Sequence, residues 1–187
     1  MKPHVLERFG VFAECLLVGV WIAVASVPVV TLPAALAAGA AHLRRWTGEE
    51  EGGWREFVAD FRRAVRRGWA VGVGGLAALA LLRADIAIVR AGLPGGPFVG
   101  AVGVLAMLAL VVTCLRACTA WRPGSSWRAL LSAAGRRTVR DPAGSLLIVC
   151  GFAVIAASAW FAAPLAAPAL GMVVAATLAV ERRMAMA

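Results

Sequence analysis

The sequence predicts an all-α membrane protein with five transmembrane helices and two amphipathic helices on the cytoplasmic side. First, the 187 residues are 61% hydrophobic and the mean hydropathy is +0.83, whereas soluble domains are about 45–50% apolar. Second, the excess lies in three runs without Asp, Glu, Lys or Arg, at 15–43, 91–115 and 142–180. Each run exceeds the roughly 20 residues that cross a bilayer core. We therefore expect a single integral membrane domain over residues 1–187.

The first span is predicted at 14–43, and two prolines interrupt it. Its apolar run is longer than the roughly 7–15 residues of a secretory signal. Pro28 and Pro33 each remove a helical hydrogen bond near mid-membrane, and Thr31 between them can satisfy a freed carbonyl. Broken helices at this depth line substrate sites in transporters, but a purely structural kink fits the same residues. The sequence leaves both interpretations open.

The second and third spans are predicted at 68–89 and 97–118, joined by a Gly- and Pro-rich turn. The second must include Arg83 and Asp85 to be long enough to cross. Acidic residues inside membranes are candidate functional residues, so Asp85 is a candidate intramembrane acid. Its position near the outer end, close to Arg83 and Arg90, favours a paired residue at the interface.

The last uncharged run is too long for one span, because a helix rises 1.5 Å per residue and the hydrocarbon core is about 30 Å thick. Pro164 and Pro168 lie past its middle. We therefore expect a tight hairpin of two spans, 144–162 and 166–181.

Two segments between the spans have the pattern of amphipathic helices, 54–67 and 126–140. Each has an apolar stripe opposite a charged face, and we expect the apolar face in lipid and the arginines near anionic headgroups. The candidate lipid or partner contacts are Arg62, Arg63, Arg66, Arg67, Arg136, Arg137 and Arg140.

The two segments share a short motif. Residues 62–66 read RRAVR and residues 136–140 read RRTVR, and each motif precedes a pair of predicted spans. Because both copies start from the cytoplasm, this would be a parallel internal repeat rather than an inverted one. Chance recurrence in a chain rich in Arg and Ala explains the match equally well.

Charge distribution predicts the orientation. Most of the 19 lysines and arginines lie at 44–67, 116–140 and 182–183, while the opposite side receives Lys2, Arg8, Arg83 and Arg90. The positive-inside rule assigns the richer side to the cytoplasm. Five spans then predict a protein of the bacterial cytoplasmic membrane with its N-terminus outside and its C-terminus inside.

No pattern in the sequence indicates catalysis. It contains no Ser/His/Asp or Cys/His constellation, no carboxylate pair within a span and no phosphate-binding glycine loop. The four cysteines lie in or beside spans, where small buried thiols are expected. We expect no enzyme activity, no metal and no cofactor. The net charge of +9 is explained by the arginines of the predicted cytoplasmic segments, so we expect no nucleic-acid binding.

Several segments resemble the first half of the YesL family of small bacterial multi-span membrane proteins, a domain without an assigned function. The resemblance covers about residues 20–90, and its motifs lie at 27–31, 34–41, 45–50 and 54–63. It departs at Leu32-Pro33, where the family pattern has Gly-Pro. Because members are often encoded near carbohydrate ABC importers, the resemblance implies an accessory or regulatory role in sugar uptake. It implies no particular functional residue.

Two functions follow as alternatives. The first is a non-enzymatic accessory component that contacts the lipid bilayer and an ABC importer or a membrane sensor. The second is a small-solute transporter or channel that uses the helix break at Pro28–Pro33. The sequence offers few polar groups to line a pathway there. The ligand, the partner and any homo-oligomeric state stay open.

Overall fold

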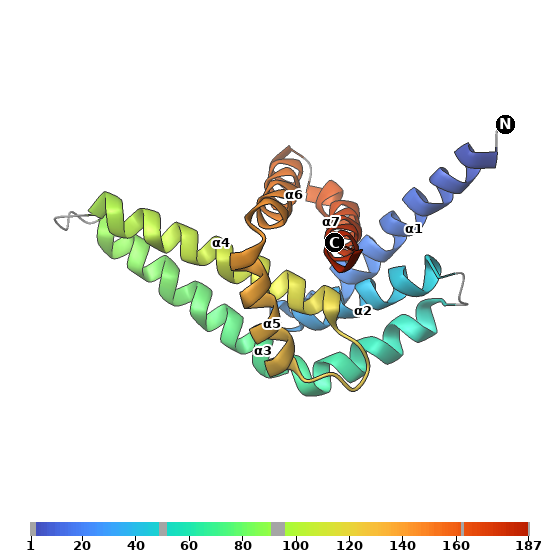
Figure 1. Ribbon diagram of the computed structural model, residues 1–187, viewed down its shortest axis with the longest axis horizontal. Coiled ribbons are helices and arrows are strands. Elements are labelled where there is room, and N and C mark those ends of the chain that lie inside the picture. Colours follow the sequence, from blue (N-terminus) through green and yellow to red (C-terminus); the bar gives the residue numbers. More distant parts are fainter. Residues whose placement is uncertain (1–2, 49–51, 91–95, 162, 187) are drawn as a thin grey trace.

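The computed structural model describes residues 3–48, 52–90, 96–161 and 163–186 (Figure 1). These residues form seven α-helices and one short 3-10 helix, and no strand occurs among them. The all-α class is therefore confirmed. The helices are α1 (Pro3–Ala25), η1 (Val29–Thr31), α2 (Leu32–Trp46), α3 (Trp54–Arg90), α4 (Gly96–Ala120), α5 (Trp127–Arg140), α6 (Pro142–Phe161) and α7 (Ala163–Met186).

The first predicted span, 14–43, is wrong as a single helix. The chain leaves α1 after Ala25, and α2 then runs back along α1 (Figure 1). His42 Nε2 lies 2.6 Å from Glu14 Oε1, so the two helices are antiparallel. The start of α1 and the end of α2 therefore lie on the same side of the molecule.

Local chemistry explains the turn. Residues 26–28 are not helical, and Pro33 occupies the first turn of α2, where its missing N–H is tolerated. The Thr31 hydroxyl donates to the carbonyls of Ala25 and Pro28, at 2.7 and 2.6 Å. The Ala25 carbonyl at the end of α1 thereby gains a partner, and the Pro28 carbonyl also accepts from the Thr31 N–H at 2.7 Å.

Helix α2 forms the centre of the molecule. Its residues from Ala34 to Leu43 are all buried, between α1, α3, α4 and α7. Most of these side chains are alanine, which lets neighbouring backbones approach closely. Gly39 contacts Ile22 and Val18 of α1 so closely that a Cβ would overlap the Ile22 side chain.

The predicted separation of a cytoplasmic helix at 54–67 from a span at 68–89 is also wrong. One continuous helix, α3, covers both segments, because Gly68 by itself weakens a helix without ending it. Figure 1 shows that α3 changes direction along its length.

The apolar faces of the two amphipathic segments pack against protein, which corrects the expectation that they lie in lipid. In α3, Phe57 and Ala64 are buried, and Trp21 of α1 stacks edge-on with Trp54. In α5, Trp127 is buried against Gly68. These contacts attach both segments to the helical core.

The second part of α3 and α4 form an arm that projects from the rest of the molecule (Figure 1). The most apolar windows in Trp54–Ala87 and Phe98–Ala120 have mean hydropathies of 1.6 and 2.6, and only 6% and 11% of their residues are buried. Both helices are long and apolar enough to cross a membrane. Five spans are not shown.

The predicted C-terminal hairpin is represented by α6 and α7, which pack against each other. The α7 helix is longer than the predicted span 166–181 at both ends, and residue 162 lies outside the described residues. Gly171 packs on the α1 backbone, where an added Cβ would lie 1.8 Å from the Cys15 carbonyl oxygen. Contact between α7 and α1 therefore closes the bundle.

Candidate functional site

A buried arginine connects the ends of three helices. Arg116 of α4 is 1% exposed, and its guanidinium donates to Asp141 Oδ2 at 2.8 Å and to Glu181 Oε1 at 3.2 Å. Arg137 of α5 completes the group by donating to Glu181 Oε2 at 2.6 Å. A buried charge requires such pairing. This network holds α4, α5 and α7 together at one end of the molecule.

Asp141 also shapes the chain between α5 and α6. Its Oδ1 accepts from the Gly144 N–H at 2.9 Å, as the N-cap residue of α6. The hydrogen bond from Arg116 and the Gly144 N–H lower the pKa of Asp141 below its ordinary value. Gly144 is required there, because a Cβ would lie 2.0 Å from Asp141 Oδ2.

Two arginines at the end of α2 hold neighbouring elements. Arg44 donates to the carbonyl oxygens of Thr119 and Trp121 at the end of α4. Arg45 Nη1 lies 2.7 Å from Asp60 Oδ2 of α3. Because α2 is central, these bonds place α3 and the segment after α4 opposite each other.

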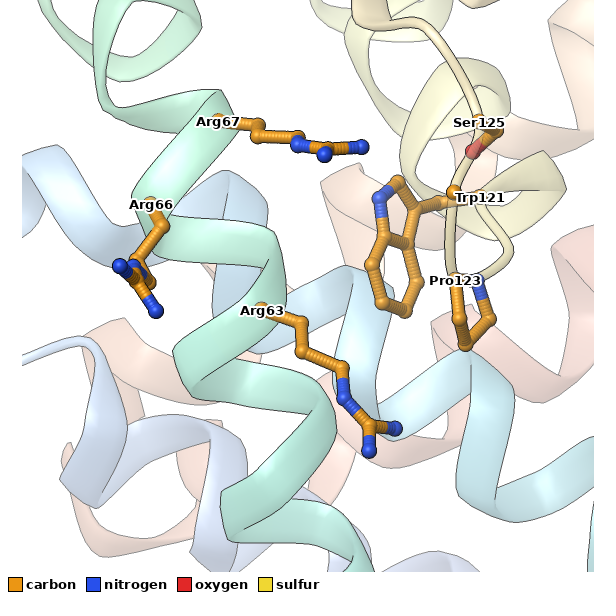
Figure 2. Close-up of a pocket in the computed structure, with 7 residues that line it drawn as sticks. Arg63, Arg66, Arg67, Trp121, Pro123 and Ser125 are labelled. Atoms are coloured by element: carbon orange, nitrogen blue, oxygen red, sulfur yellow. The ribbon is translucent and has the colours of Figure 1, made fainter.

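A cleft of about 590 Å³ lies between α3 and the loop that joins α4 to α5. Its lining combines three arginines of α3 with an aromatic and turn-forming loop: Arg63, Arg66, Arg67, Trp121, Pro123, Gly124 and Ser125. Figure 2 shows Arg67 and Arg63 extending towards the loop on either side of the Trp121 ring, while Arg66 points away from it. The result is a positively charged cleft with an aromatic wall, which we call the arginine cleft.

The loop side of the arginine cleft is a tight turn. The Ser125 N–H donates to the Arg122 carbonyl at 3.0 Å, with Pro123 and Gly124 at the central positions. Gly124 has φ +90°, as a type II turn requires at its third residue. The turn and the bonds from Arg44 hold Trp121 in place.

The structure separates the arginines that the sequence grouped. Arg63, Arg66 and Arg67 line the cleft, and Arg137 belongs to the buried network. The remaining candidates are exposed and do not line the cleft: Arg62, Arg136 and Arg140. These arginines have different surroundings because their side chains leave the α3 and α5 helices in different directions.

The other candidate residues lie elsewhere. Asp85 is exposed on the arm, and no ion pair joins it to Arg83 among the described residues; the Arg90 side chain is not described. The helix break at Pro28, Thr31 and Pro33 packs against α3, where a Cβ on Gly72 would lie 2.0 Å from the Val30 carbonyl oxygen. None of these residues lines the arginine cleft.

Sequence reasoning missed Arg116, Trp121 and Asp141. Asp141 and Glu181 directly flank the uncharged run 142–180, and this pair of acids was a signal for a basic partner. The Pro123-Gly124 pair was a signal for a fixed turn beside Trp121. Neither signal indicates which arginine pairs with the acids or which arginines face Trp121.

Within the described residues, no group of three or more His, Cys, Asp or Glu side chains could hold a metal ion. No protein-family model, curated protein or solved structure shows a significant match to this chain.

Proposed function

We propose that this chain is an integral membrane protein that serves as a non-enzymatic accessory or regulatory component of a larger membrane assembly. The observation that carries the membrane assignment is the projecting arm of α3 and α4. Its helices are strongly apolar, and few residues in their most apolar windows are buried. Exposed apolar surface of this extent is unfavourable in water, and lipid covers it without cost.

We further propose that both chain ends face the cytoplasm, in place of the outside N-terminus expected from five spans. The antiparallel packing of α1 and α2 supports this orientation, because it returns the chain to the side on which it began. Lys2 and Arg8 then join the arginine-rich side. The positive-inside rule is better satisfied than with the N-terminus outside.

Cysteine labelling tests this topology. In a background with the four native cysteines replaced by alanine, a single cysteine is placed at Lys2, Leu93 or Ala187. A membrane-impermeant maleimide should label position 93 in intact bacterial cells, and positions 2 and 187 only after permeabilisation. Labelling of position 2 in intact cells would support the outside N-terminus instead. Recovery of the chain in the soluble fraction would contradict the membrane assignment.

The accessory role is supported by the exposed arginines on α3 and α5, which offer a charged surface to a partner. The resemblance to the YesL family suggests a carbohydrate ABC importer or a membrane sensor as that partner. Purification of the tagged chain in mild detergent, followed by mass spectrometry, should recover importer or sensor subunits in stoichiometric amounts. Recovery of the chain by itself, or as a homo-oligomer, would contradict this role.

A further inference from the structure

We propose that the arginine cleft is a binding site for a phosphate group. The group could be carried by a soluble phosphate compound or by the headgroup of an anionic lipid, since both present the same oxygens. This site is independent of the accessory role, because it depends only on the geometry between α3 and the loop after α4.

The arginines of α3 concentrate positive charge along the cleft. Arg63 and Arg67 are one helical turn apart on α3 and extend towards the loop on both sides of Trp121 (Figure 2). Like charges at this spacing repel each other. A phosphate bound in the cleft lowers that repulsion, and a guanidinium can donate two parallel hydrogen bonds to its oxygens.

The protein's own acids leave this charge largely uncompensated. Asp60 accepts hydrogen bonds from Arg45 at 2.7 Å and from Arg63 at 3.4 Å, so one carboxylate is shared by two arginines. No acidic side chain of the described residues forms an ion pair with Arg67. Arg67 and the nitrogens of Arg63 other than Nη1, which donates to Asp60, are therefore open to an external anion.

The opposite wall is rigid before any ligand binds. Trp121 is 3% exposed, and its carbonyl accepts a hydrogen bond from Arg44 at 2.5 Å. The turn at Pro123 and Gly124 fixes the chain that follows. A wall held in place by a second helix reduces the entropy lost on binding. The volume of about 590 Å³ accommodates a phosphate together with its ester substituent.

The test uses the full chain with two probes. Inorganic phosphate is titrated into protein in a neutral, phosphate-free detergent and followed by calorimetry. In parallel, protein in nanodiscs of phosphatidylcholine and phosphatidylglycerol is released and analysed by native mass spectrometry for retained phosphatidylglycerol. If inorganic phosphate binds and displaces phosphatidylglycerol from the protein, the natural ligand is a soluble phosphate compound. If phosphatidylglycerol is retained and inorganic phosphate does not bind, the ligand is a lipid headgroup. Either result supports the phosphate site.

The double variant Arg63→Gln/Arg67→Gln should bind the effective probe about tenfold more weakly or worse, because charge-assisted hydrogen bonds are lost. The matched control Arg55→Gln/Arg62→Gln removes the same charge from exposed positions of the same helix, and it should bind within about twofold of the parent. Thermal melting of both Gln variants checks that they fold. A second variant, Arg63→Lys/Arg67→Lys, keeps the charge but loses the paired donors of the guanidinium, and we expect it to bind with intermediate affinity. Equal weakening in both Gln variants, or no binding of either probe, would overturn the proposal.

Discussion

The two arginine motifs of the chain, RRAVR at 62–66 and RRTVR at 136–140, have similar sequences and different surroundings. The first continues into Arg67-Gly68, and the helix continues with it. The second continues into Asp141-Pro142, and the helix ends. Asp141 then pairs with buried Arg116, and Arg137 pairs with Glu181. Thus the second motif is joined to the core, whereas the first lines an open cleft.

The two motifs differ in the acids that lie near them in the folded chain. Asp141, directly after the second motif, caps α6 and pairs with Arg116, and Glu181 of α7 pairs with Arg137 of the motif. Arg67, at the matching position of the first motif, adds positive charge instead.

The largest expected effect comes from removing the acid of the second motif. Asp141→Ala leaves Arg116 buried beside fewer acceptors and removes the cap of α6, so we expect a loss of about 3–5 kcal/mol in stability. Thermal unfolding in detergent measures it. Asp85→Ala, at an exposed acid of α3, is the control and should melt like the parent. Equal melting temperatures for both variants would show that the network is not structural.

The next largest expected effect is a loss of stability when a tightly packed glycine that follows the first motif is replaced. Gly72 of α3 faces the Val30 carbonyl, whereas Leu146, at the matching position of α6, is 63% exposed. Gly72→Ala should therefore destabilise the protein by about 1–3 kcal/mol through overlap with backbone. Gly74→Ala, two residues along in open space, should be neutral or stabilise by up to about 1 kcal/mol. Melting curves that rank the two variants in reverse would contradict the close packing of α3 against η1.

The third effect comes from an acid placed directly after the first motif. Arg67→Asp gives α3 the residue that the second motif has at Asp141. We expect phosphate or phosphatidylglycerol binding to fall about tenfold or more, because the anion then meets a carboxylate. Stability should change by less than about 1 kcal/mol, since position 67 is exposed. Unchanged binding in the calorimetric or mass-spectrometric assay would remove Arg67 from the site.

The smallest effect is a dependence on pH. Because the pKa of Asp141 is lowered in the folded state, its ionised form stabilises the fold above the ordinary Asp pKa of about 3.9, and the stabilisation is lost as pH falls through the folded value. The difference in melting temperature between parent and Asp141→Asn should be constant from about pH 7 to 5 and shrink below about pH 4. A difference that widens with acid would contradict the Arg116–Asp141 pairing.

Features that depend on neighbouring residues were predictable from the sequence. Long apolar runs predict helices, Pro28 and Pro33 interrupt the first of them, and amphipathic periodicity identifies 54–67 and 126–140. Such features follow from backbone sterics and from side-chain spacing within a few turns. They suffice for the fold class and for the place where the first helix breaks.

Only the tertiary structure decided what those features do. A proline interrupts a helix without setting the direction of the next one, so the return of α2 along α1 came from packing around Ala34–Leu43 and from the Glu14–His42 contact. The Arg116–Glu181 pair and the arginine cleft join residues far apart in the chain. Their pairing depends on which faces of distant helices meet, because burial selects that arrangement through the whole core rather than through any single segment.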